Sequence, residues 1–561
     1  MSKFTPVIRN VFYLILLLLI SACQKENKVA DLIVTDATIW TGNPDQPLAQ
    51  ALAISGDTIL GVGSNEDVLK FKGETTKVEN ANGKFITPGF IDAHVHFLGG
   101  GFNLASVKLR DANTSEEFAK RISDFAKTTK PGTWIVGGEW DGKAWGMLPD
   151  KNWIDSVTKN HPIFLMRLDG HMGLANSLAL KLVGIDNNVK DIMGGTIVRN
   201  KKGELTGVFK DNAMTLILDK IPPPSAEEID NALQEAMKYV ASNGVTTVHN
   251  VWNAGDPDVY TDGIERARKN NSLITRIYDL GSLKNWQTVK ERVDKYGRGD
   301  KWLSFVGVKG FVDGSLGSQT AAFREPYVGF PNETGLFLDT KEDLYNYISE
   351  ADKAGLHIAV HAIGDDAINF LLNTFEKVAT ENGPRNRRFR IEHVQHLAKE
   401  DVPRFAQLNV IASMQPYHAI DDGRWAEKSI GPERIKTTYA FKSLLDANAI
   451  LAFGSDWYVA PPTPLEGIYA AVTRRTIDDK NPDGWVPEQK ITVEQALVAY
   501  TRNGAYASFE ENIKGSLEPG KLADFVIISE DITKIDPVKI RDTKILQTYV
   551  GGKKVFESKD E

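Results

Sequence analysis

The 561-residue chain has a single cysteine, Cys23, so it cannot form an internal disulfide. It also lacks a block of basic residues: 66 Lys and Arg against 74 Asp and Glu give a net charge of −8. This balance argues against nucleic acid as the main partner. With 42% apolar and 25% charged residues, the composition is globular. The length is typical of three to four domains or of one large barrel with additions.

Long apolar runs are missing too, and the one short run lies near the start. Val11 to Ile20 follows the basic residues Lys3 and Arg9. As a helix it would be about 15 Å long, half of a roughly 30 Å hydrocarbon core, so we do not expect it to span a membrane. Its length is typical of a signal-peptide apolar region. The sequence Ile20-Ser21-Ala22-Cys23 then resembles a bacterial lipobox.

We therefore expect residues 1–22 to be a lipoprotein signal peptide and Cys23 to carry a lipid after cleavage. The alternative is a core cysteine beside a short helix. The lipid would anchor the protein to the bacterial envelope on the extracytoplasmic side. Outer-membrane anchoring is preferred, because Gln24 and its neighbours lack the aspartate that favours inner-membrane retention.

Both ends of the remaining chain are rich in β-strand patterns. Residues 31–88 contain short apolar runs with turns, including a hairpin pattern around Ser55-Gly56-Asp57. Near the other end, Ala523–Ser529 is an apolar run, and Gly551-Gly552 splits Leu546–Phe556 into a second hairpin pattern. We expect residues 31–88 and 515–557 to form one composite β-sandwich domain.

The middle of the chain alternates strand and helix patterns, which predicts an α/β fold. Helical patterns cover Ala226–Ala241, Lys341–Ala354, Asp366–Ala379 and Thr438–Ala447. Eight candidate strands are enough to close a (β/α)8 TIM barrel over residues 89–514. These strands are Phe90–His96, Val245–Asn250, Thr275–Leu280, Val306–Asp313, His357–His361, Phe389–Val394, Val410–Gln415 and Ile450–Asp456. Residues 98–224 exceed one crossover, so we expect an insertion after the first strand that caps the barrel mouth.

Histidines and one aspartate lie at the ends of these strands. His94 and His96 are two apart in a strand, so both side chains point to one face and can bind one metal. His361, His393 and Asp456 end the fifth, sixth and eighth candidate strands. Functional side chains of this barrel lie at the carboxyl ends of its strands, so we expect all five to converge.

Lys309 lies among apolar neighbours in the fourth strand and needs a compensating partner. One interpretation is a salt bridge with Asp313. The other is carboxylation by carbon dioxide, which would give an oxygen ligand between two metals, because a buried lysine can lose its proton.

Together these motifs resemble the amidohydrolase superfamily, specifically the amidohydrolase 3 branch that includes N-substituted formamide deformylases. The resemblance covers roughly residues 31–556. It rests on the segments Ile86–His96, Val312–Ser318, His361–Asp365, Arg390–His393, Gly454–Trp457 and Gly520–Asp524. The resemblance implies that the metal set is His94, His96, Lys309, His361, His393 and Asp456.

Imidazole and carboxylate ligands favour a divalent metal, with zinc preferred and one or two ions possible. The expected reaction is hydrolysis of a non-peptide carbon–nitrogen bond in a small amide-type substrate by metal-activated water. We assign catalysis to Asp456 as general base, with His393 and His171. Substrate contacts are expected from His171, Asp141, Asp313 and His418. For His171 the alternative is a loop-fixing pair with Asp169, and His161 and His396 are expected at the surface.

Two other functions stay open at this stage. The chain could be a lipid-anchored binding protein that has lost catalysis, or a phosphoester or lactone hydrolase on the same scaffold. A deaminase is disfavoured, because no HxxE pairing follows His361.

The lipid anchor predicts the behaviour of Cys23→Ser. This substitution should release the chain from membranes or block its processing, because the lipidated side chain is lost. Fractionation of cells into membrane and soluble material, followed by immunoblotting, measures the distribution. An unchanged membrane fraction together with an unchanged size of the processed chain on the immunoblot would contradict the assignment of Cys23.

Overall fold

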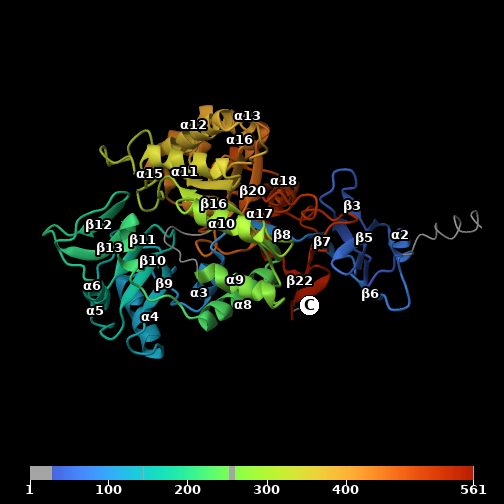
Figure 1. Ribbon diagram of the computed structural model, residues 1–561, viewed down its shortest axis with the longest axis horizontal. Helices are drawn as coiled ribbons and strands as arrows, with labels where there is room; N and C mark the ends of the chain where they lie inside the picture. The colour runs from blue at the N-terminus through green and yellow to red at the C-terminus, as the bar shows by residue number, and fades with distance from the viewer. Residues whose placement is uncertain (1–27, 143–144, 252–258, 560–561) are drawn as a thin grey trace, which may run out of the picture.

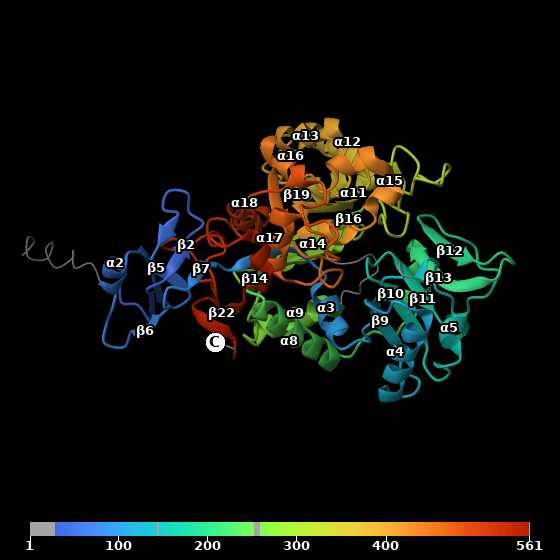
Figure 2. The ribbon, with the colours of Figure 1, turned by 180° about the vertical axis from the view of Figure 1, so that it is seen from behind.

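The computed structural model describes residues 28–142, 145–251 and 259–559, arranged in three parts along its long axis (Figure 1). A β-rich part made from both chain ends lies at one side, a barrel lies in the centre, and an inserted region lies at the other side, as Figure 2 shows from behind. The expected signal peptide and Cys23 lie outside the described residues. Within those ranges no helix is both long and apolar enough to cross a membrane.

The centre is an eight-stranded parallel sheet in which every neighbour is the next strand along the barrel part of the chain. Its strands are β8 (Phe90–Val95), β14 (Val245–Val251), β15 (Arg276–Ser282), β16 (Leu303–Phe311), β17 (His357–Ala362), β18 (Arg390–His393), β19 (Ile411–Met414) and β20 (Ile450–Phe453). Each expected strand is present, and the TIM-barrel prediction is confirmed.

The barrel closes between its last and first strands through residues that follow β20. The Asp456 N–H donates to the His94 carbonyl at 2.7 Å, and the His96 N–H donates to the Trp457 carbonyl at 2.6 Å. Beneath them, the buried carboxylate of Asp92 accepts hydrogen bonds from the Ser455 N–H at 2.8 Å and the Ser455 hydroxyl at 2.5 Å. This seam sets Asp456 directly beside His94 and His96.

The helices around the barrel follow the expected patterns with one shifted start. α8 (Ala226–Ser242) begins with a capping box, in which Ser225 and Glu228 each accept from the other's backbone N–H. α11 (Lys341–Lys353) and α12 (Asp365–Glu381) bury one apolar face each. α16 (Phe441–Asp446) begins later than expected, because Tyr439 has a φ of 50°, which a right-handed helix cannot include.

Strands from both chain ends share one six-stranded sheet, in the order β23-β22-β21-β7-β2-β3. These are β23 (Lys553–Glu557), β22 (Ile545–Val550), β21 (Phe525–Ile528), β7 (Phe85–Pro88), β2 (Thr38–Trp40) and β3 (Leu48–Ala49). A four-stranded sheet packs nearby, with the order β5 (Thr58–Gly63), β4 (Ala51–Ser55), β1 (Leu32–Thr35) and β6 (Lys77–Asn80). A buried apolar cluster that includes Val34, Ile54 and Phe525 draws on both sheets.

The chain between β8 and β14 builds a separate five-stranded sheet. Its order is β12 (Gly195–Arg199), β13 (Leu205–Asp211), β11 (Met172–Ala175), β10 (Ile163–Arg167) and β9 (Ile135–Trp140). α4 (Ser115–Thr128) packs on this sheet through Phe118 and Ile122, and a cluster with Trp140 and Leu165 forms the core. The inserted region therefore has a hydrophobic core of its own.

A buried ion pair joins the barrel to the sheet made from the chain ends. The guanidinium of Arg276, at the start of β15, donates to both oxygens of Asp524 at 2.7 and 2.8 Å. Asp524 also accepts from the Gly551 N–H at 2.7 Å. Both side chains are buried, so each depends on the other for compensation of its charge.

Asp524→Asn should therefore lower the free energy of unfolding by about 3–5 kcal/mol, because Arg276 keeps its buried charge without a carboxylate. Denaturant unfolding measures the change. The matched control is Asp124→Asn, which removes an exposed carboxylate paired with Lys120 and Lys127 and should leave the free energy of unfolding nearly unchanged, because solvent screens these pairs. Equal changes in the free energy of unfolding for the two substitutions would show that the buried Arg276–Asp524 pair stabilises the fold no more than an exposed pair does.

Candidate metal centre

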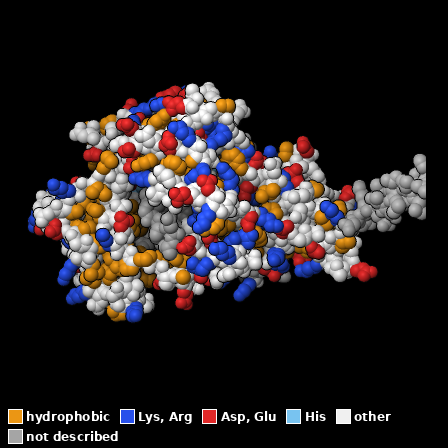
Figure 3. Space-filling model, viewed as in Figure 1, with side chains coloured by type: hydrophobic (Ala, Val, Ile, Leu, Met, Phe, Trp, Pro, Cys, Tyr) orange, Lys and Arg blue, Asp and Glu red, His pale blue; other side chains and the backbone are white. Residues whose placement is uncertain are grey.

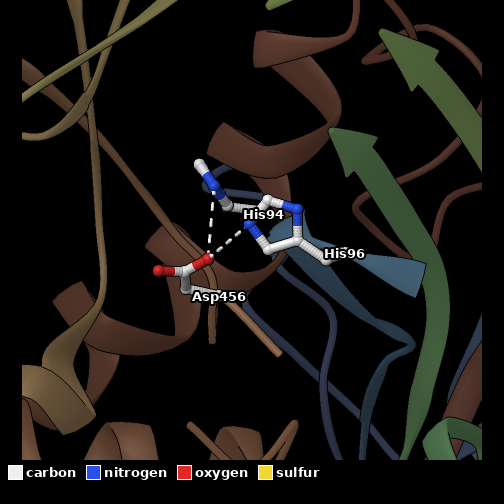
Figure 4. A group of neighbouring side chains, drawn as sticks. All are labelled: His94, His96 and Asp456. Atoms are coloured by element: carbon white, nitrogen blue, oxygen red, sulfur yellow. Dashed lines mark ion pairs between the residues drawn. The ribbon is translucent and has the colours of Figure 1, made fainter. Parts of the chain in front are cut away.

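His94 on β8, His96 directly after it and Asp456 after β20 meet at the end of the barrel (Figure 4). One oxygen of Asp456, Oδ1, lies 3.1 Å from His96 Nε2 and 3.5 Å from His94 Nε2. Although 362 positions separate His94 from Asp456, the seam of the barrel brings them into contact. The spacing of two residues in β8 turns both imidazoles toward the same oxygen.

Three imidazoles are held by an acceptor at the Nδ1 atom. The contacts are His94 to Glu392 Oε2 at 2.6 Å, His96 to the Val251 carbonyl at 3.0 Å, and His393 to Gln415 Oε1 at 2.9 Å. Because these oxygens can only accept, Nδ1 carries the proton in each ring. The lone pair of the neutral ring is then on Nε2, which is how metal-binding histidines are usually oriented.

His361 joins the same group with its ring turned the other way. Its Nε2 lies 3.0 Å from the Gly314 carbonyl, which leaves Nδ1 as the nitrogen free to bind a metal. The His361 and His393 ring centroids are 4.5 Å apart, and the His393 and His94 centroids are 4.8 Å apart. The side chains of β8, β17 and β18 therefore converge at one end of the barrel.

Lys309 is buried beside these histidines. Its Nζ lies 3.5 Å from His94 Nε2 and 4.3 Å from the centroid of the Phe311 ring. Burial lowers the pKa of Lys309 to about 8, so about a tenth of this side chain is unprotonated at pH 7.

The alternative salt bridge between Lys309 and Asp313 is wrong. The Asp313 carboxylate is fully buried and accepts backbone N–H groups of Ala322, Ile363 and Gly364. It holds the segment after β16 against the end of β17.

Burial sets the charge state of the centre. Burial, reinforced by Lys309, lowers the pKa of His94 to about 4, and burial also holds the pKa of His393 well below its usual value. Both are thus neutral near pH 7, the form that binds metals. Burial alone would raise the pKa of Asp456, but the adjacent His94 and His96 imidazoles outweigh it and lower that pKa. Asp456 is therefore ionised.

The described residues offer two groups of ligand atoms that share Asp456. His94, His96 and Asp456 form one, and His393, His418 and Asp456 form the other, with ligand atoms within 4.8 Å of one another in each. Asp456 Oδ1 and His418 Nε2 are buried and have no hydrogen-bond partner. A buried carboxylate oxygen without a donor fits a bound cation.

This cluster opens into a cavity of about 990 Å³ that lies between the barrel end and the inserted sheet. His96, Lys309, His361, His393 and Asp456 line it from the barrel. Among the proposed substrate contacts, His171 and His418 also line it, whereas Asp141 and Asp313 do not.

Several expected contacts are corrected by this geometry. Asp141 is not among the lining residues, and its carbonyl accepts a hydrogen bond from Arg167 Nε at 3.2 Å. The His171 side chain pairs with Asp211, Nδ1 to Oδ1 at 2.8 Å, and not with Asp169. Burial opposes protonation of His171, but Asp211 outweighs it and raises the pKa.

Two other histidines differ from expectation. His161 and His396 are buried rather than exposed. Their Nδ1 atoms lie 3.2 Å from the Thr133 carbonyl and 3.0 Å from the Thr438 hydroxyl, respectively.

Sequence reasoning missed the residues that orient the ligands, above all Glu392. This carboxylate bridges His94 and the guanidinium of Arg390, whose Nε lies 2.8 Å from Glu392 Oε1. Burial alone would raise the pKa of Glu392, but Arg390 and His94 outweigh it and lower the pKa. A signal was available: Arg390 and Glu392 alternate in a buried strand, so both charged side chains share one face and need partners there.

A sequence model of the amidohydrolase family matches residues 77–556, most of the chain. The chain belongs to the amidohydrolase family. The match includes all eight barrel strands and every residue of the expected metal set. This family assignment agrees with the resemblance seen in the motifs.

Similar proteins cover nearly the whole of this amidohydrolase. Protein LONG AFTER FAR-RED 3 of Arabidopsis thaliana is 42% identical over 94% of this chain and 92% of its own length. N-substituted formamide deformylase of Arthrobacter pascens is 27% identical over 94% of this chain and 98% of its own. The crystal structure of an uncharacterized metal-dependent hydrolase from Pyrococcus horikoshii superimposes with a TM-score of 0.72 at 26% identity, covering 90% of this chain and 99% of that one.

Glu392→Gln tests the orientation of His94. The amide can turn its NH2 group toward Nδ1, which favours the wrong tautomer, so metal affinity should fall by roughly 10–100-fold. Competition with a chromophoric chelator measures the affinity, and circular dichroism checks the fold. Glu376→Gln removes a surface carboxylate and serves as the control. Unchanged affinity in folded Glu392→Gln would contradict the role of Glu392.

Proposed function

We propose that this amidohydrolase is a metal-dependent enzyme that hydrolyses a non-peptide carbon–nitrogen bond of a small amide. The observation that carries the proposal is the ionised Asp456, whose Oδ1 has no hydrogen-bond donor and lies 3.1 Å from His96 Nε2 at the wall of a cavity. The formamide deformylase among the relatives supports an amide-type bond, and the metal-dependent hydrolase structure supports a cation.

We infer that His94, His96, Lys309, His361, His393 and Asp456 would hold one or two divalent ions, with zinc favoured by the nitrogen-rich set. Such an ion supplies Lewis acidity, which lowers the pKa of water and polarises a carbonyl. The lowered pKa of Lys309 supports carboxylation of this side chain, because the neutral amine is the form that reacts with carbon dioxide.

Asp456 has the charge and the position for proton transfer. It takes a proton from the attacking water as the new carbon–oxygen bond forms at the substrate carbonyl. It then returns that proton to the nitrogen as the carbon–nitrogen bond breaks, so an acid and an amine leave the site. His393 keeps its orientation through Gln415, and His171 and His418 face the cavity, where they can hydrogen-bond the substrate.

The inserted region is proposed to cap the barrel mouth, since residues from both parts line the same cavity. We also retain the proposal of a lipid anchor at Cys23 on the extracytoplasmic side of a bacterial membrane, with the outer membrane preferred.

Asp456→Asn should lower kcat/KM by at least about 100-fold, because the amide cannot accept the proton from water. Hydrolysis of a panel of amides, lactones and phosphoesters by the metal-loaded protein, with metal content checked by mass spectrometry, measures it. Asp446→Asn, at an exposed surface carboxylate, is the control.

Three results would overturn parts of the proposal. Normal turnover by Asp456→Asn would refute the assignment of Asp456 as the general base. Turnover confined to lactones or phosphoesters would refute the bond type, and a wild-type protein that retains no metal and hydrolyses nothing would favour a binding protein.

A further inference from the structure

The cavity beside the metal centre carries far more carboxylates than cations. Its described lining contains seven acids and two cations, Arg167 and Lys309, a difference of five (7 − 2) before any charge on the histidines or on cations outside the lining is counted. Besides Asp456, the acids are Asp169, Asp211, Asp219, Glu228, Asp421 and Asp422. One divalent ion would still leave an excess of three.

Neither cation is available to a bound molecule. The guanidinium of Arg167 is almost fully buried, with an ion pair to Asp169 and a weaker one to Asp141 at 3.5 Å. Asp169 is fixed in this pair by the hydroxyls of Ser315 at 2.6 Å and Ser318 at 3.1 Å. Lys309 belongs to the metal set. A substrate carboxylate would therefore lose its hydration without gaining a cationic partner from the described lining.

Part of the wall formed by the inserted region is apolar. Trp134, Val136, Met166, Leu218 and Ile221 line the cavity, followed by the prolines at 222–224. Val136 stays 42% exposed although it is apolar. Figure 3 shows hydrophobic side chains gathered over the inserted region on the left of that view. Exposed apolar side chains that border a cavity indicate a binding surface for an apolar group.

The volume of about 990 Å³ is at the upper end of the range, roughly 300–1,000 Å³, that holds a drug-sized molecule. A small amide alone would leave most of this space to water. The apolar wall and the volume together favour a substrate with a large apolar substituent.

We propose that the substrate is an uncharged amide carrying a bulky apolar group, and that amides bearing a carboxylate, such as N-acyl amino acids, are rejected. The inference rests on the proposed function, because it names the substrate class of the same site. The masked Arg167 and the excess of carboxylates supply the rejection. The apolar side chains of Trp134, Val136, Leu218 and Ile221, with the prolines at 222–224, supply the affinity.

Three matched amides test the rejection on the metal-loaded wild-type protein. N-acetyl-2-phenylethylamine and N-acetylphenylalaninol are neutral, and N-acetylphenylalanine adds a carboxylate at nearly the same size; both enantiomers of the chiral pair are assayed. We expect kcat/KM for the carboxylate to be at least about tenfold lower than for the alcohol. Equal or faster hydrolysis of the carboxylate would overturn the inference.

Failure of the proposed function is a distinct outcome. If the protein hydrolyses none of the three, calorimetric affinities of the same compounds decide the inference separately. Tighter binding of the two neutral amides supports it, and equal or tighter binding of the carboxylate overturns it.

Asp169→Asn tests the masking of Arg167. Loss of the carboxylate leaves the guanidinium charged and facing the cavity, so kcat/KM for N-acetylphenylalanine should rise several-fold relative to the alcohol. The matched control is Asp191→Asn, which removes the carboxylate partner of Arg199 elsewhere on the inserted region. No relative gain in a folded Asp169→Asn protein would overturn the masking. If this variant does not fold, the kcat/KM values of the wild-type protein for N-acetylphenylalanine and N-acetylphenylalaninol decide whether the inference holds.

Discussion

Closure of the barrel is the constraint on which the candidate site depends. The last strand meets the first through Asp92, which accepts two hydrogen bonds from Ser455, and through backbone bonds between residues 94–96 and 456–457. A buried carboxylate must find donors, and the segment after β20 provides them. The segment 455–457, which closes the sheet, therefore also places Asp456 beside His94 and His96. The site is thus formed when the barrel closes.

Polar groups inside the barrel support this closure from below. Arg390 is fully buried and donates to Glu392, Ser413 and the Ala93 carbonyl, and Glu392 in turn fixes His94. Each buried charge is compensated by a neighbour, and the chain of contacts ends on an imidazole whose free nitrogen faces the centre. The barrel interior thereby sets the tautomer of a candidate ligand.

The barrel and the inserted region have different roles in the proposed enzyme. Strand ends supply the residues for chemistry, as in other barrels of this type. The inserted region supplies the apolar wall and the Arg167–Asp169 pair, which bear on what enters. This division explains why the motifs of the barrel indicate the family, whereas they say little about the substrate.

The sequence by itself determined the eight strands, most helices and the five strand-end residues His94, His96, His361, His393 and Asp456. The reason is that strand periodicity is a local pattern, and in a barrel of parallel strands the carboxyl ends of all strands lie on the same face. Only the tertiary structure decided which hydrogen-bond partner each buried polar side chain has. Glu392 orients His94, Asp211 holds His171, and Asp313 anchors backbone instead of facing substrate. Such contacts join residues 40 to 298 positions apart, and no local pattern encodes which buried carboxylate finds which donor.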